Sequence, residues 1–180
     1  LRLDAAASLG NWEYTNDVNG TYSPDEGSGQ DVIEYDFYID GLKVGDAPQS
    51  QVAVAASIFP VAGASLQVVG KIFGNHHAEY DPFSRTDDPG SGDRVAAWQP
   101  PGYQLFDLHA SYNLANILPI RDGGDVRLFA NVFNLFDEMY VQDAVDNSRF
   151  NGFDGDNDAD DAEIFIGIPR SFNFGLQVRF

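Results

Sequence analysis

The sequence of 180 residues contains no cysteine and few basic residues, and both features limit what the protein can be. Without cysteine, disulfide bonds do not hold the fold together. Lysine and arginine number 10 against 28 aspartate and glutamate residues, which gives a formal net charge of −18. This balance argues against nucleic-acid binding, because contacts to phosphate need lysine and arginine.

Long apolar runs and catalytic motifs are also missing. No run approaches the roughly 18 apolar residues that indicate a transmembrane helix. We find no nucleophile paired with a base, no glycine-rich phosphate loop and no Cys/His metal spacing. The sequence therefore predicts a protein that is not an enzyme. Hydrophobic residues nevertheless make up 43% of the chain, which argues against acidic disorder.

What the sequence does contain is alternation of apolar and polar residues, the pattern of a strand with two different faces. It predicts six strands, at residues 2–14, 50–59, 64–74, 103–114, 125–136 and 170–180. Most have about the 9–11 residues that a tilted strand needs to cross a bilayer. In the last segment the apolar positions are Phe172, Phe174, Leu176, Val178 and Phe180. The stretch 31–44 also has strand composition, and we interpret it as an extension within a loop.

The connections between these segments alternate between long and short. They are residues 15–49, 60–63, 75–102, 115–124 and 137–169. The three long ones hold 23 of the 28 acidic residues but only four basic residues. Long loops at one end and short turns at the other are typical of outer-membrane barrels. The sequence thus predicts an all-β protein, a section of an antiparallel up-and-down transmembrane β-barrel. The acidic loops indicate a saline habitat or bound divalent ions.

Four stretches carry a resemblance to a known family. They are "GLKVGDAPQSQVAVAAS", "PPGYQLFDLHASYNL", "VRLFANVFNLFDEMYV" and "GIPRSFNFGLQVRF", in this order. From about residue 40 onward the chain resembles the C-terminal barrel portion of a TonB-dependent outer-membrane receptor. It departs from the family pattern at Phe133, where many relatives have a small or polar residue.

The resemblance implies a fold and a function. Such receptors import scarce nutrients, namely ferric siderophores, haem, cobalamin or oligosaccharides, through a 22-strand barrel filled by a plug. Residues 1–180 would be the last six strands, and the chain a fragment without plug, TonB box or earlier strands. The implied partners are outer-membrane lipid, the TonB complex through the missing N-terminal region, a small nutrient ligand, and the barrel-assembly machinery. That machinery would read the terminal strand, Phe172 to Phe180.

Two groups of residues are candidate binding sites. In "DGDNDADDAE", carboxylates at spacing two (Asp154, Asp156, Asp158 and Asp160) are of the type that binds calcium. The EF-hand pattern is not met, however, because Ala159 stands at its glycine position and Phe165 at its glutamate position. The alternative is a solvated acidic loop.

The second group follows the third predicted strand, where His76 and His77 stand close to Tyr80. These residues suit contact with iron, haem or another ligand. Adjacent strand residues point to opposite faces, so the two histidines chelate jointly only if the strand has ended. We interpret His109, on the polar face of the fourth segment, as a hydrogen-bonding residue of the barrel lumen.

Two other classes of protein share much of this pattern. A passive porin has the same strand pattern but no plug. A secreted acidic β-sandwich that acts as a binding module also has alternating strands, and it would be soluble without detergent.

Overall fold

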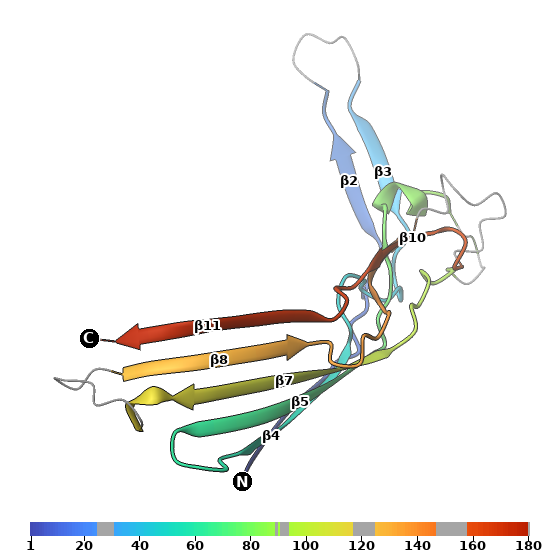
Figure 1. Cartoon of the computed structure of the whole chain (residues 1–180). Coiled ribbons are helices and arrows are strands. Elements are labelled where there is room, and N and C mark those ends of the chain that lie inside the picture. The colour runs from blue at the N-terminus through green and yellow to red at the C-terminus, as the bar shows by residue number, and fades with distance from the viewer. Residues whose placement is uncertain (25–30, 89, 91–93, 117–124, 147–157, 180) are drawn as a thin grey trace.

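The computed structural model describes residues 1–24, 31–88, 90, 94–116, 125–146 and 158–179, and these residues form an all-β protein (Figure 1). The described residues include no α-helix, only two short 3₁₀ turns at Pro82–Arg85 and Leu114–Asn116. None of the helical segments in these ranges has the length and apolar character needed to cross a membrane.

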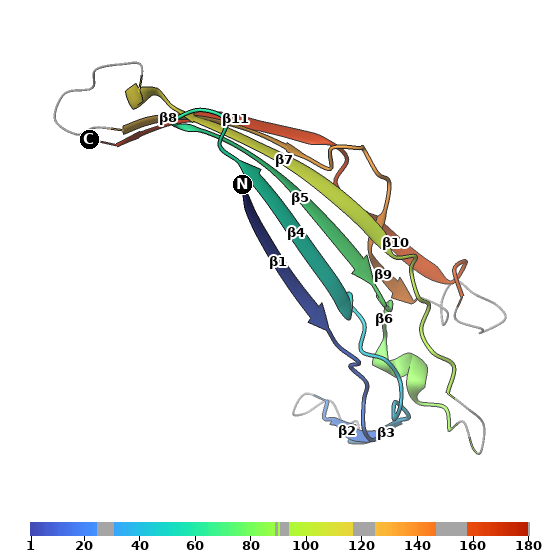
Figure 2. The same ribbon diagram turned by 90° about the horizontal axis from the view of Figure 1, so that it is seen from below.

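Six antiparallel strands form the main sheet, in the order β1-β4-β5-β7-β8-β11. Their bounds are β1 (Arg2–Leu9), β4 (Ser50–Ile58), β5 (Ala64–Gly74), β7 (Tyr103–Asn113), β8 (Asp125–Phe133) and β11 (Ser171–Arg179). All six predicted strands are confirmed. The first is shorter than the predicted 2–14, because the side chain of Gln49 bonds both the N–H and the C=O of Trp12 and ends the ladder. Figure 2 shows that the sheet is strongly curved.

The register of the sheet separates an apolar face from a polar face, because directly paired residues lie on the same side. The apolar face comprises Leu3, Ala5, Ala7, Leu9, Val52, Val54, Ala56, Ile58, Leu66, Val68, Ile72, Phe106, Leu108, Ala110, Val126, Leu128, Ala130, Val132, Phe172, Phe174, Leu176 and Val178. The polar face includes Arg2, Asp4, Gln51, Ser57, Ser65, Gln67, Lys71, Asp107, His109, Ser111, Asn113, Arg127, Asn131, Asn173, Gln177 and Arg179.

The apolar face is uncovered. Phe174 is 84% exposed, Phe172 69% and Leu3 68%. Within the described residues, no second sheet packs against the main sheet, and its edge strands β1 and β11 do not pair with each other. The main sheet is therefore open rather than closed into a barrel.

The long connections contain structure of their own, which the sequence predicted only for the extension at 31–44. The first holds a hairpin of β2 (Val18–Tyr22) and β3 (Ile33–Phe37), so strand structure in 31–44 is limited to β3. β6 (Glu79–Tyr80) in the second connection and β9 (Val141–Asp146) and β10 (Ala162–Ile166) in the third form a separate sheet, β10-β9-β6. Its β6–β9 pairing is parallel.

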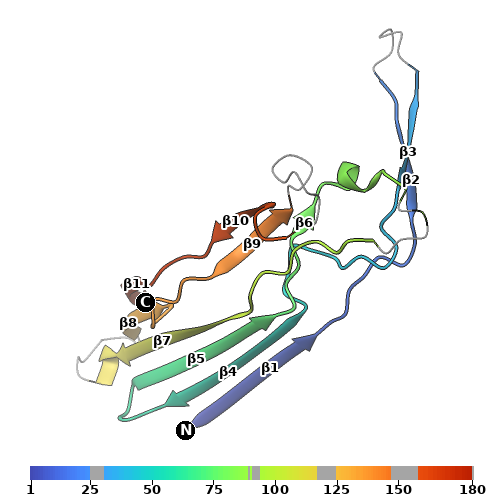
Figure 3. The same ribbon diagram turned by 90° about the vertical axis from the view of Figure 1, so that its right-hand side faces the viewer.

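The only cluster of buried apolar side chains among the described residues lies in these long connections, beyond one end of the main sheet (Figure 3). We call it the connection core. It comprises Ile39, Leu42, Ala78, Tyr80, Ala97 and Ala144, with Phe37, Trp98 and Val141 packed against it. Each long connection contributes at least one residue, so the connection core joins segments that are far apart in the sequence.

Candidate functional site

His76 lies at the point where the three long connections meet. The chain leaves β5 at Gly74, so the strand has ended before the two histidines. The side chain of His76 is only 2% exposed, and its Nε2 lies 3.8 Å from Oδ1 of Asp143 on β9. Both ring nitrogens are buried, and neither has a hydrogen-bond partner.

His77 and Tyr80 lie close to His76 in the chain but in different surroundings. His77 is half-buried, and its Nδ1 is buried without a hydrogen bond. Tyr80 belongs to the connection core, and its ring meets the edge of Tyr14 at a centroid distance of 6.3 Å. The structure thus brings the three predicted ligand residues into one segment, against the buried core rather than into an open cleft.

Burial dominates the electrostatics of this segment. Desolvation lowers the pKa of His76, although the carboxylates of Asp143 and Asp46 act in the opposite direction. Desolvation likewise lowers the pKa of His77, and the nearby charges of Lys43 and His76 add to that effect, whereas a hydrogen bond with the backbone of Ala97 opposes it. Both rings therefore favour the neutral form, in which imidazole nitrogen is a ligand or a hydrogen-bonding group.

Beyond β6, a buried arginine holds the segment to β9. The guanidinium of Arg85 lies 4.9 Å from the centre of the Tyr80 ring and donates to Oδ2 of Asp146 at 3.4 Å. Arg85 also donates to the carbonyl of Val95 at 2.7 Å. Burial raises the pKa of the Tyr80 hydroxyl and lowers the pKa of Arg85, which the charge of Asp146 opposes.

The stretch "NLFDEMY", residues 134–140, forms a tight turn built around Asn134. This residue is buried and has a φ of 50°. Its Nδ2 donates to the carbonyls of Glu138 (2.8 Å) and Ile168 (3.2 Å), and its Oδ1 accepts the N–H of Glu138 (2.9 Å). Its backbone N–H donates to Asp107 on β7 at 3.0 Å. One side chain thus fixes the exit from β8 and the entry to β11.

The last two stretches of the resemblance, which contain "NLFDEMY" and "GIPR", pack directly on one another. The N–H of Gly167, in "GIPR", donates to the carbonyl of Tyr140 at 2.9 Å. A Cβ at Gly167 would overlap the Tyr140 ring, so only glycine fits there. Arg170 joins the two stretches a second time, because its backbone N–H donates to Oδ1 of Asp137 at 2.8 Å.

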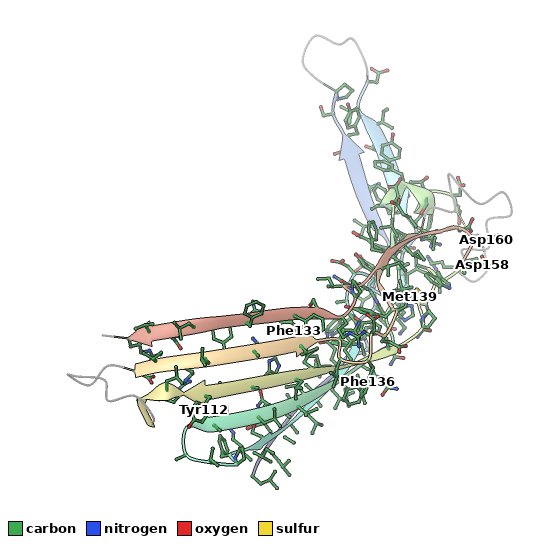
Figure 4. The ribbon with its side chains drawn as sticks, viewed as in Figure 1. Tyr112, Phe133, Phe136, Met139, Asp158 and Asp160 are labelled. Atoms are coloured by element: carbon green, nitrogen blue, oxygen red, sulfur yellow. The ribbon has the colours of Figure 1, made fainter. Side chains whose placement is uncertain are left out.

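Hydrogen bonds cross the polar face of the main sheet from strand to strand. Nζ of Lys71 donates to Asp107 at 2.6 Å, and Asp107 is almost fully buried. His109 shares a hydrogen bond of 2.9 Å with Asn131, which places its ring on the polar face as expected. Phe133 packs against the His109 ring at a centroid distance of 5.7 Å, and it stands at the end of β8 nearest the connections (Figure 4).

The candidate assembly residues of the terminal strand lie on β11. Phe172, Phe174, Leu176 and Val178 are all exposed on the apolar face. Each pairs with an apolar residue of β8, for example Phe174 with Ala130. Phe180 lies outside the described residues.

The predicted calcium residues are described only in part. Asp154 and Asp156 lie outside the described residues. Asp158 and Asp160 are exposed on the side of the connections away from the main sheet (Figure 4). Oδ1 of Asp158 accepts the N–H of Asp160 at 2.9 Å, a bond within the acidic loop. Over the ranges that the structure describes, no group of three or more His, Asp or Glu side chains is placed to hold a metal ion.

Sequence reasoning missed Asn134, Asp107 and Asp143 as organising residues. Asn134 stands within a stretch that the resemblance singled out, and an asparagine after an alternating strand is a residue type that tolerates positive φ. A buried position for Asp107 was not expected from the alternation alone. Nothing in the sequence connects Asp143 with His76, since 67 residues separate them.

Comparison of the chain with protein-family models, with curated proteins and with solved structures finds no match. The resemblance to a family therefore rests on the four stretches of sequence alone.

Proposed function

We propose that the chain is a section of the β-barrel of an outer-membrane receptor of the TonB-dependent type, which actively imports a scarce nutrient. Nutrients of the class are ferric siderophores, haem, cobalamin and oligosaccharides. The observation that carries the proposal is the uncovered apolar face of the main sheet. In a protein that folds in water such a face packs on another layer. Here large apolar residues on β1, β4, β5, β8 and β11 remain exposed, and those of β7 are half-buried.

In this proposal the apolar face contacts lipid and the polar face lines the barrel interior. The strands have 8–11 residues, which suits a tilted crossing of the hydrocarbon layer. The hydrogen-bonded pairs of the polar face, such as Lys71 with Asp107 and His109 with Asn131, suit a wet interior. Lipid cannot satisfy the open edges of β1 and β11, so further strands pair with both and close the barrel.

The resemblance supports an importer over a passive porin. Its last two stretches also pack together, through Gly167 and Tyr140. The long acidic connections lie at one end, which in this proposal faces outward. A secreted β-sandwich gains no support, because no second sheet covers the apolar face over the residues that the structure describes.

The membrane proposal is tested with neighbouring spin labels on opposite faces. These 180 residues contain no cysteine, so a single cysteine at Phe174 or at Asn173 is their only labelling site, and any cysteine elsewhere in the gene product is first replaced by serine. Outer membranes are prepared from cells that express the complete gene. We expect the label at 174 to collide with dissolved oxygen, which concentrates in lipid, and the label at 173 to collide with a water-soluble nickel complex. The same two measurements are repeated on β8, with labels at Leu128 on the apolar face and at Arg127 on the polar face.

A label at 174 that neither reagent reaches, in a protein that purifies without detergent, would refute the membrane proposal. The importer proposal needs a separate test. Cells expressing the complete gene are compared with and without a functional TonB complex while they take up candidate iron chelates, haem, cobalamin and sugars. Uptake that continues without TonB would indicate a passive porin instead.

A further inference from the structure

We propose that His76 and His77 form a proton-operated latch, which holds β6 against β9 when both rings are neutral and releases it when they are protonated. The inference concerns the long connections only and does not depend on what surrounds the main sheet. It starts from the position of the two rings. Three buried nitrogens of adjacent histidines have no hydrogen bond, and His76 is almost completely enclosed.

Few backbone hydrogen bonds hold the part of this segment between β5 and β6, whereas Arg85 fixes its far end. The carbonyl of His77 accepts the N–H of Asp46 at 3.3 Å, and the N–H of Ala78 donates to Trp98 at 2.8 Å. The pairing of β6 with β9 extends over only two residue pairs, Glu79 with Val145 and Tyr80 with Asp146. Such short pairing is among the first parts of a fold to open locally.

Packing against the first connection is close, so the segment has little room to adjust around a charged ring. A Cβ on Gly45 would lie 2.5 Å from the carbonyl oxygen of Ala78. A proton on His76 therefore places a positive charge in a closely packed site. Protonation of the neighbouring His77 places a second positive charge there. Hydration of these charges requires that the segment move away from its neighbours.

The charged groups around the rings come from three elements. Asp143 on β9 and Asp46 in the first connection attract a protonated His76, whereas Lys43 repels a protonated His77. At the other end of β6, Arg85 and Asp146 form an ion pair at 3.4 Å. Desolvation outweighs the attraction, and the pKa of both histidines is lowered in the closed arrangement.

The direction of the pH effect follows from these shifts. In an opened segment each histidine has its ordinary pKa of about 6.5, and in the closed one it lies lower. The opened form therefore binds protons first as the pH falls. The closed latch keeps its full stability above about pH 6.5 and loses it progressively below that value. Acidification thus loosens the contact between the second and third long connections.

The test measures the distance across the small sheet. Glu79 on β6 and Glu163 on β10 both pair with Val145, from opposite sides of β9, so two strand spacings or about 10 Å separate them. Spin labels on cysteines at 79 and 163 of the full chain, folded in detergent micelles, are then coupled strongly enough to broaden the spectrum. We expect broadening at pH 8 and its loss at pH 5.

The variant with both His76→Gln and His77→Gln should retain the broadening at pH 5. His109→Gln is the matched control, since it removes the remaining histidine of the chain, and it should leave the response to acid unchanged. Equal broadening at both pH values in the unchanged histidine background would overturn the proposal, as would the same loss in the double variant.

A double variant that shows no broadening at pH 8 has lost the small sheet. In that case the pH titration of the imidazole proton signals is measured in the spin-labelled protein that retains both histidines, and it tests the latch. Titration of His76 and His77 below the midpoint of free histidine, together with loss of the coupling over the same pH range, supports the latch. Titration at the ordinary midpoint without any change in the coupling overturns it.

Discussion

Replacing Asn134 by alanine should destabilise the connections more than any other single change in the "NLFDEMY" turn. The substitution removes three side-chain hydrogen bonds, two donated by Nδ2 and one accepted by Oδ1. Each contributes about 1 kcal/mol to stability. Asparagine also tolerates the φ of 50°, whereas alanine in the left-handed region costs about 1 kcal/mol more. The free energy of unfolding should therefore fall by roughly 4 kcal/mol.

Asn134→Gly separates these contributions. Glycine adopts a positive φ without strain, but it lacks all three side-chain hydrogen bonds. It should lose about 3 kcal/mol, so its difference from alanine measures the backbone contribution. Urea unfolding in detergent micelles, followed by tryptophan fluorescence, measures both variants, because Trp98 packs against the connection core. An alanine variant within about 0.5 kcal/mol of the parent would show that the turn does not depend on Asn134.

Two further predictions concern charge. Lys71→Met removes the cation 2.6 Å from the buried Asp107 and should lower the free energy of unfolding by roughly 1–3 kcal/mol. Adding Asp107→Asn to the same chain should restore most of that loss. The same urea titration measures both variants, and additive losses would contradict the pairing. The acidic long connections repel themselves at low ionic strength, so backbone hydrogen exchange at Asp143 and Asp146 should slow as salt is raised toward 1 M, where the Debye length is about 3 Å. Exchange that is independent of salt and of calcium would contradict this.

The main sheet was predictable because its information is local. Alternation over residues 64–74 or 125–136 shows both the strand and its two faces, and short turns fix antiparallel neighbours. Prediction extended the first strand to Tyr14 and the fifth to Phe136. The first ends early because a distant side chain, Gln49, bonds Trp12, and the fifth because the turn at Asn134 follows Phe133 directly.

Structure inside the long connections was not predictable for the opposite reason. β6 has only two residues, and β9 carries two aspartates in six positions, so neither shows a clear alternating apolar pattern. Their pairing depends on contacts across more than sixty residues of sequence, such as Tyr80 with Asp146. The candidate site is of this kind. The residue types His76 and His77 stood out in the sequence, but the burial of His76 and its approach to Asp143 follow only from how three connections pack.

Apolar residues are distributed differently in the main sheet and in the long connections. The connection core contains three alanines among its six buried residues, so it buries little side-chain surface. On β11 alone, Phe172, Phe174 and Leu176 each leave more than half of their surface exposed. Fully burying such a side chain stabilises a protein by about 1.5–3 kcal/mol. Three of them represent roughly 5–9 kcal/mol, comparable to the whole stability of a typical domain.

Strands β1, β4, β5 and β8 add further exposed side chains of the same kind, such as Leu3 and Leu128. A small core at one end of the sheet cannot supply the burial that these residues lack. The cover of the apolar face is therefore part of what makes the sheet stable, and removing that cover should favour association through both the face and the open edges of β1 and β11. For this reason the surroundings of Phe174 and Asn173, two neighbouring residues on opposite faces, discriminate more sharply between the candidate functions than any residue of the connections.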